Sequence, residues 1–310
     1  MIRTVSPIVL ITLFLIFSCG GGSSVKEEPP LSHPAHKLLQ KGVGWYQRGC
    51  FHKSLEAFTR AHELFTASDR LPGVAMSLNN IGNVYRYIGD THSSLLFYQE
   101  AYAIYAQLAD HDGAMQALAN QAAILIQNDR LDEATETIQK AKALAESFGI
   151  VAPQVLNNQG ILFTRQKQYA DAESILLKAL DATANQNVPT RATSYSALGN
   201  LMAAQGAYKQ AIEFYLDALA IDQQIDFHPG IADNLNAIGN AYLQIQEYHQ
   251  AATYLQRSVK IYALFGNTKQ VAQNLESLEK SARHADIDLT VTRHFVEKWL
   301  KGEVLEHPCP

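Results

Sequence analysis

Two pairs of asparagines stand four residues apart in the sequence, Asn79 with Asn83 and Asn236 with Asn240. If both stretches are helical, each pair projects from one face of its helix. A side-chain amide both donates and accepts hydrogen bonds, so such a pair can bond a peptide group without selecting a side chain. Asparagine is a poor residue for a helix interior, and its repeated use indicates a purpose. The pairs predict peptide binding; the alternative is that these amides bond to water or to a neighbouring repeat.

Residues that could catalyse a reaction or hold a metal form no comparable set. The sequence lacks the phosphate-binding loop, the zinc-protease motif, the nucleophile elbow and any Cys-x-x-Cys. Gly42-x-Gly44 lacks the third glycine of a dinucleotide-binding loop, and His33 and His36 have no further ligand near them in sequence. We therefore expect no enzyme, no cofactor and no metal site.

The elements that would position the asparagines follow from a repeat. A small residue recurs at spacings of 40, 40, 38, 39 and 40, with a large apolar or aromatic residue sixteen positions after it. Small residues let two helices cross closely, and the large ones fill the space beside the crossing. The four prolines between residues 35 and 300 all fall between copies, where a proline can open a helix. The pattern predicts six helix pairs, with these anchors: Gly42, Gly82, Ala122, Gly160, Gly199 and Gly239.

This pattern resembles the tetratricopeptide repeat, whose signature includes Leu-Gly-x-x-Tyr followed by Ala-x-x-x-Phe. Ile81-Gly82-Asn83-Val84-Tyr85 carries the resemblance most legibly, although the period is longer than the usual 34 residues. The resemblance implies an all-α, right-handed superhelical solenoid of six helix-turn-helix repeats over residues 35–266. Two capping helices are expected within 267–301, since a repeat array needs a polar end.

In this family the first helix of each repeat forms the concave groove, and positions around the anchor face it. Arginines there could hold a carboxylate, and the third copy supplies an apolar strip of Ala119, Ala123 and Ile126. Because Asn79, Asn83, Asn236 and Asn240 would face solvent, we expect their replacement by alanine to affect binding and hardly folding. The predicted peptide-binding groove comprises Asn79, Asn83, Arg86, Tyr87, Asn157, Arg165, Ser196, Asn200, Asn236, Asn240 and Gln244.

The start of the chain predicts export. Residues 1–18 carry one arginine and a ten-residue apolar run, which is too short to span a membrane and typical of a signal peptide. Ile16-Phe17-Ser18-Cys19 resembles the lipobox of bacterial lipoproteins, which implies acylation of Cys19; an ordinary secretory signal with an incidental cysteine is the alternative. Residues 19–34, beginning with a Gly/Ser stretch, would form a flexible tether. Gly20 after the cysteine favours the periplasmic side of the outer membrane.

The other two cysteines lie far apart in sequence. Cys50 falls in the turn of the first copy, and Cys309 falls in residues 302–310, which we expect to form a loose tail. A disulfide needs Cα atoms within about 7 Å, and a solenoid separates its ends. The sequence therefore predicts that both thiols stay unpaired within one chain, with an intermolecular bond as the alternative.

Charge narrows the possible partners. The chain has 25 basic and 30 acidic residues and a formal charge of −5, so it lacks the basic excess of a nucleic-acid-binding protein. The sequence as a whole predicts a lipid-anchored tetratricopeptide-repeat scaffold or adaptor that binds a protein or extended peptide. Its setting would be bacterial envelope assembly, in pilus, secretion or cell-wall machinery. The alternative is a receptor for a free peptide or small solute in the same groove.

Overall fold

The computed structural model describes residues 33–183, 188–304 and 309; the predicted signal peptide, Cys19 and nearly all of the tether lie outside the described residues. The described body is all helical, which confirms the predicted fold class. In it, no helix combines the length and apolar character needed to cross a membrane. The helices are α1 (Pro34–Gln47), α2 (Phe51–Ala67), α3 (Leu71–Ile88), α4 (Thr91–Gln107), α5 (His111–Gln127), α6 (Leu131–Ser147), α7 (Pro153–Arg165), α8 (Tyr169–Ala182), α9 (Val188–Ala204), α10 (Tyr208–Gln224), α11 (His228–Gln244), α12 (Tyr248–Leu264), α13 (Thr268–Ala285) and α14 (Thr290–Leu300).

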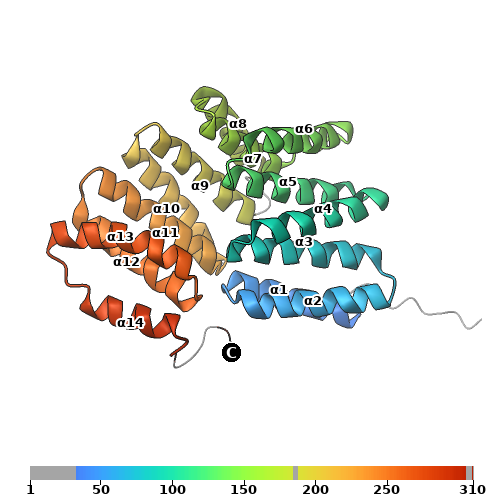
Figure 1. Ribbon diagram of the computed structural model, residues 1–310. Helices are drawn as coiled ribbons and strands as arrows, with labels where there is room; N and C mark the ends of the chain where they lie inside the picture. The colour runs from blue at the N-terminus through green and yellow to red at the C-terminus, as the bar shows by residue number, and fades with distance from the viewer. Residues whose placement is uncertain (1–32, 184–187, 305–308, 310) are drawn as a thin grey trace, which may run out of the picture. The chain divides into compact units, whose positions relative to one another are not determined.

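Neighbouring helices pack in chain order, and most of the odd-numbered helices also contact the next odd-numbered helix. Each of α1 to α12 packs on the helix that follows it, and α1 contacts α3, α3 contacts α5, α5 contacts α7 and α7 contacts α9 (Figure 1). The odd-numbered helices from α1 to α11 are thus the first helices of the six repeats and lie on the inner side of the array. Because no single pair can bury its apolar face alone, the stacked pairs share a continuous core.

The anchor residues are small because a large side chain from the second helix lies directly against them. A Cβ atom added at Gly199 would stand 2.5 Å from the ring of Tyr215, which is closer than real Cβ contacts allow. The third copy, in which the residue facing the anchor is Ile138 rather than an aromatic, has Ala122 as its anchor. Glycine is the anchor in the other five copies, including those in which it faces Leu176 and Leu255, where an added Cβ would stand 2.4 and 2.6 Å from the leucine side chain.

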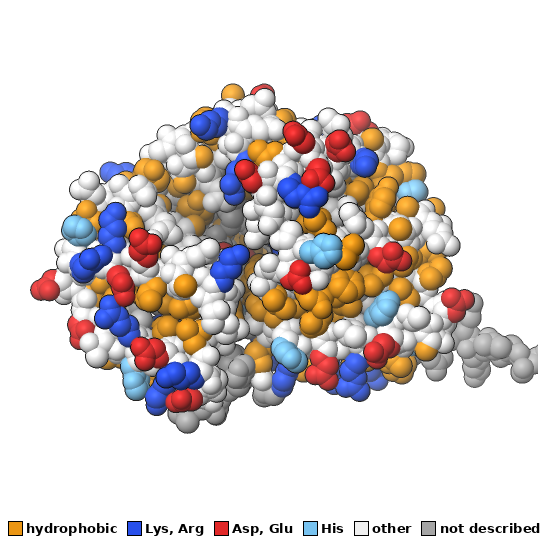
Figure 2. Space-filling model, viewed as in Figure 1, with side chains coloured by type: hydrophobic (Ala, Val, Ile, Leu, Met, Phe, Trp, Pro, Cys, Tyr) orange, Lys and Arg blue, Asp and Glu red, His pale blue; other side chains and the backbone are white. Residues whose placement is uncertain are grey.

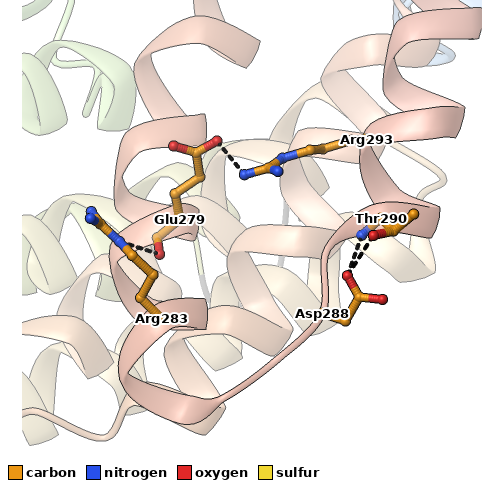
Figure 3. Close-up of polar contacts among 5 residues, drawn as sticks. All are labelled: Glu279, Arg283, Asp288, Thr290 and Arg293. Atoms are coloured by element: carbon orange, nitrogen blue, oxygen red, sulfur yellow. Dashed lines mark hydrogen bonds and ion pairs between the residues drawn. The ribbon is translucent and has the colours of Figure 1, made fainter.

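The last two helices close the end of the array. The apolar residues of α13, Val271 and Leu278 among them, are buried in one cluster with residues of α12 and α14. The start of α14 is fixed by Asp288, whose Oδ1 accepts hydrogen bonds from the backbone N–H and the hydroxyl of Thr290 (Figure 3). Arg293 then pairs with Glu279 of α13 at 2.9 Å (Figure 3). These contacts hold α14 at the corner after α13.

The prediction that Cys50 and Cys309 stay unpaired is wrong. The two cysteines form a disulfide with Cα atoms 5.4 Å apart, so the tail is fastened to the start of α2 at Cys309 rather than loose. The sequence argument failed because it treated the array as extended, whereas the first copy meets the last ones.

Five aromatic side chains form the contact between the first copies and the last ones. We call them the aromatic seam: Tyr46, Phe51, Tyr87, Phe227 and Phe265. The Phe51 ring meets the edge of Phe265 with centroids 6.1 Å apart, and Tyr46 stacks on Phe227 at 6.1 Å. Phe265 also occupies the space beside Gly49, where an added Cβ would stand 2.4 Å from its ring. Contact between the two ends of the array is therefore apolar and closely packed, with the disulfide beside it.

Candidate binding cavity

A cavity of about 530 Å³ lies on the inner side of the array, between α3 on one side and α9, α10 and α11 on the other. Figure 2 shows this face of the molecule hollowed near its middle. The volume falls within the range of small-molecule and cofactor sites. Its lining combines aromatic side chains, Tyr87, Tyr215 and Phe227, with these polar ones: Arg86, Gln154, Thr190, Thr193, Ser196, Asn200, Asp222, Asp233 and Asn234.

Arg86, in the last turn of α3, supplies the positive charge of the cavity. Its guanidinium lies over the ring of Tyr87, 5.2 Å from the centroid, and its Nε is buried without a hydrogen-bond partner. Burial lowers the pKa of Arg86, but the nearby hydroxyl groups of Tyr46, Tyr98 and Tyr87 together raise it by a larger amount. The net pKa is therefore above its ordinary value, and the side chain stays charged. Because its Nε has no hydrogen-bond partner in the protein, the charged guanidinium of Arg86 can still bond to a ligand.

Asp222, near the end of α10, is a carboxylate in a place where three of the other copies bury an aromatic ring. It follows its anchor by 23 positions, as Phe65 and Tyr105 do in the first two copies. The side chain is 4% exposed, and its Oδ2 accepts a hydrogen bond from Asn234 Nδ2 at 2.8 Å. Burial, with a contribution from the charge of Asp233, raises the pKa of Asp222 to about 7.

Asp233 is the second carboxylate of the cavity and comes from α11. Tyr262 of α12 donates a hydrogen bond to its Oδ1 at 2.5 Å. The side chain is open to the space of the cavity, yet the surrounding protein shields it from bulk water. This burial raises the pKa of Asp233 to about 6, although the Tyr262 hydrogen bond and the charge of Arg86 act in the opposite direction.

The cavity gathers four of the predicted groove residues: Arg86, Tyr87, Ser196 and Asn200. Asn200 also has a structural partner, because it accepts a hydrogen bond from the hydroxyl of Tyr215 at 2.7 Å. The same pairing occurs in the second copy, where Tyr98 donates to Asn83 at 2.8 Å. The asparagine one position after the anchor thus bonds to a buried tyrosine of its own repeat, a partner that the sequence did not predict.

Two of the predicted groove residues do not face the groove. Asn79 is 4% exposed and accepts a hydrogen bond from Asn120 of the next repeat at 3.0 Å. Asn157 is 1% exposed, with its Nδ2 directed at the carbonyl oxygen of Thr190. The expectation that Asn79 faces solvent is wrong, and Asn157 does not face the groove, because in these two copies the residue three before the anchor is directed at the next first helix.

The remaining predicted residues lie away from the cavity lining. Asn236 and Asn240 share a helix face as expected, and Asn240 Nδ2 donates to Asn236 Oδ1 at 2.8 Å. Gln244 is exposed, and Arg165 lines a separate hollow of about 440 Å³ that also includes Asn200.

Sequence analysis missed Asp222, Asp233, Phe227 and Gln154. For Asp222 a signal existed, since three other copies have an aromatic residue 23 positions after the anchor and only the fifth copy has an acid there. For Asp233 and Phe227 the sequence carries no comparable signal, because their place opposite α3 depends on the curvature of the whole array. Among the described residues, no group of three or more His, Cys, Asp or Glu is arranged to hold a metal ion.

The repeated helix pairs, their small anchors and the stacked first helices define a helical-repeat protein. The family model of the tetratricopeptide repeat matches residues 38–107 and 190–263. The chain is a tetratricopeptide-repeat protein, as the sequence pattern predicted. None of the curated protein sequences matches it.

Solved structures with the same fold are distant in sequence. The Rap conjugation gene regulator of plasmid pLS20, in complex with the Phr* peptide, is 15% identical with a TM-score of 0.55; the match covers 94% of this chain and 84% of that one. The apo form of RapI is 16% identical with a TM-score of 0.50 and coverage of 81% and 98%. The STAND protein PH0952 from Pyrococcus horikoshii, with a tetratricopeptide-repeat sensor, is 14% identical with a TM-score of 0.54, over 85% of this chain and 40% of that one. At these identities the likeness shows the fold alone.

Proposed function

We propose that this tetratricopeptide-repeat protein binds a short peptide segment, free or within a protein partner, in the cavity between α3 and α11. The observation that carries the proposal is the cavity itself. It has the volume of a ligand site and brings a guanidinium and an open carboxylate together with amide and aromatic groups. Such a mixture of an apolar wall and a few oriented polar groups is typical of sites that bind a flexible ligand.

The closure of the array favours a segment over a folded domain. The aromatic seam and the Cys50–Cys309 disulfide join the first copy to the later ones beside the cavity. A folded partner would have to bind on the outer surfaces, whereas a peptide can enter the hollow. The similar structure of the pLS20 regulator is itself a peptide complex, and we propose that this chain uses the same fold for a peptide ligand.

We also propose that the protein acts in the bacterial envelope, held by a lipid on Cys19. This part of the proposal depends on the signal-like residues 1–18, the lipobox-like Ile16–Cys19 and the Gly/Ser stretch that follows. A tether of this composition would let the repeat body meet partners near the bilayer surface. Assembly work such as pilus, secretion or cell-wall machinery is the setting that we propose.

A thermal-shift screen of random hexapeptide pools and of sugars tests the proposed function. We expect peptide pools to raise the melting temperature and sugars to leave it unchanged. Thr193 lines the cavity with an exposed side chain, so Thr193→Trp should fill the space without entering the core and should abolish the shift. Glu213→Trp, at an exposed position of α10 outside the cavity lining, is the matched control and should keep it. Stabilisation by sugars alone, or a shift that survives Thr193→Trp, would contradict the proposal.

A further inference from the structure

The charged groups of the cavity come from opposite walls and are not paired with one another. Arg86 lies on α3, whereas Asp222 and Asp233 lie on α10 and α11. Within the described part of the chain, Arg86 makes no ion pair, and neither do the two acids. The charge of Arg86 still acts on Asp233, whose pKa it lowers against the larger effect of burial. The two groups are therefore near enough to influence each other and too far apart for a direct contact.

Each carboxylate is oriented from behind by a neutral donor. Tyr262 holds Oδ1 of Asp233, and Asn234 holds Oδ2 of Asp222. Asn234 is fixed in turn, because its Oδ1 accepts a hydrogen bond from Ser196 at 2.8 Å. Neutral donors position an acid without neutralising its charge. The arrangement leaves the acids able to accept a cationic group from a ligand.

Arg86 is positioned in a similar way. Its guanidinium is stacked over Tyr87, while its buried Nε lacks a hydrogen-bond partner. A guanidinium prefers a planar acceptor such as a carboxylate. Two acids against one base leave the cavity negative when all three are ionised, so a purely anionic ligand is disfavoured. A ligand that carries a cationic and an anionic group close together could pair with the carboxylates on one wall and with Arg86 on the other.

We infer that the cavity selects peptide segments that carry an amino group next to an acidic group, with the amine on Asp233 and the acid on Arg86. The inference rests on the proposed function and names the ligand chemistry of the same site. Tyr87 and Phe227, which also line the cavity, can contact the aliphatic part of a lysine chain or a peptide terminus. Asp222, the more deeply buried acid, adds negative charge near Asp233 when it is ionised.

A displayed library of random hexapeptides, selected on the purified protein, tests the inference. We expect enriched sequences to contain lysine beside aspartate or glutamate, or a free amino terminus beside such an acid. The enriched peptides are then synthesised with the lysine acetylated or with the terminus acetylated, which identifies the amine that binds. Blocking that amine should weaken binding to the wild type at least tenfold, as measured by calorimetry.

Variants of the cavity test whether Asp233 and Arg86 recognise the charged groups of the peptide. Asp233→Asn should reduce the effect of blocking the amine to less than threefold, and Arg86→Gln should do the same for replacement of the peptide acid by its amide. Asp217→Asn, an exposed residue of α10 outside the cavity, is the matched control and should keep the wild-type difference. Enriched peptides without a basic group, or equal blocking effects in wild type and Asp233→Asn, would overturn the inference while leaving peptide binding intact. Enrichment that is unchanged by Thr193→Trp would overturn the proposed function as well.

Discussion

At the scale of single residues, the asparagines of the first helices serve two different purposes. Asn83 and Asn200 each accept a hydrogen bond from a buried tyrosine, whereas Asn236 and Asn240 bond to each other on an accessible helix face. One residue type at related positions is thus structural in some copies and free of core contacts in another. The side chain sixteen positions after the anchor decides which, since it is Tyr98 or Tyr215 in the first case and Leu255 in the last.

This difference predicts the stability of single variants. Asn200→Ala should lower the free energy of unfolding by about 1–3 kcal/mol, because it leaves the hydroxyl of the buried Tyr215 without its partner. Asn236→Ala removes no core contact and should stay within about 0.5 kcal/mol of the wild type. Urea unfolding followed by circular dichroism measures both. In a double-mutant cycle, Tyr215→Phe should cancel most of the cost of Asn200→Ala; additive costs would show that the bond is unimportant.

The buried acids predict how stability depends on pH. Burial raises the pKa of Asp222 to about 7 in the folded chain, above its value of about 4 in the unfolded chain. Between these values the folded state binds more protons than the unfolded state, so stability falls as pH rises from about 4 to 7. Asp222→Asn should remove this part of the slope and be more stable than the wild type at pH 8, by on the order of 1 kcal/mol.

Unfolding curves at pH 5 and pH 8 provide the measurement, with Asp217→Asn as the control at an exposed site. The control should keep the pH dependence of the wild type. A wild-type stability that rises between pH 5 and 8, or a slope that Asp222→Asn leaves unchanged, would show that Asp222 is ionised without cost in the fold.

At the scale of elements, the repeat was predictable because its determinants are local. Each anchor meets the residue sixteen positions later within one helix pair, so a fixed spacing records a physical contact. The site was not predictable in the same way. Arg86 could be assigned to the inner wall from its repeat position. Asp233 lies across the cavity from Arg86 only because the curvature of the array brings α11 opposite α3. Asn79 was misplaced because its contact with Asn120 joins two repeats and depends on their exact rotation.

Anchor glycines predict a paired effect of alanine substitution. Gly199→Ala should lower the melting temperature, because the added Cβ would meet the Tyr215 ring at 2.5 Å and overpacking costs about 1–3 kcal/mol. Alanine at Gly44, in the last turn of α1, would meet nothing within 4 Å. Gly44→Ala should therefore raise stability by up to about 1 kcal/mol through helix propensity. If both substitutions stabilise the protein, the crossing at Gly199 is looser than the contact implies.

At the scale of the whole molecule, the proposed lipid anchor depends on one sulfur atom. Acyl chains hold a protein at a membrane through the burial of their methylene groups, each contributing about 0.8 kcal/mol. Cys19→Ser should therefore leave the protein in the soluble fraction or as an unprocessed precursor. Fractionation of bacterial cells that express the two forms measures this, with Cys50→Ser as the control that should stay membrane-bound. Fully processed Cys19→Ser protein in the membrane fraction would end the lipoprotein proposal.

The covalent tie between the two ends of the array predicts a link between redox state and binding. Cys50 and Cys309 are separated by 259 positions, and a disulfide that closes a long loop typically stabilises a protein by about 2–4 kcal/mol. Cys309→Ser should lower the melting temperature, and Cys50→Ser should lower it equally without a further loss in the double variant. Because the bond supports the aromatic seam, and Tyr87 and Phe227 of the seam also line the cavity, peptide affinity should fall with stability. In the Cys19→Ser background, thiol titration should find no free thiol before reduction; two free thiols in the folded, oxidised protein would contradict the bond.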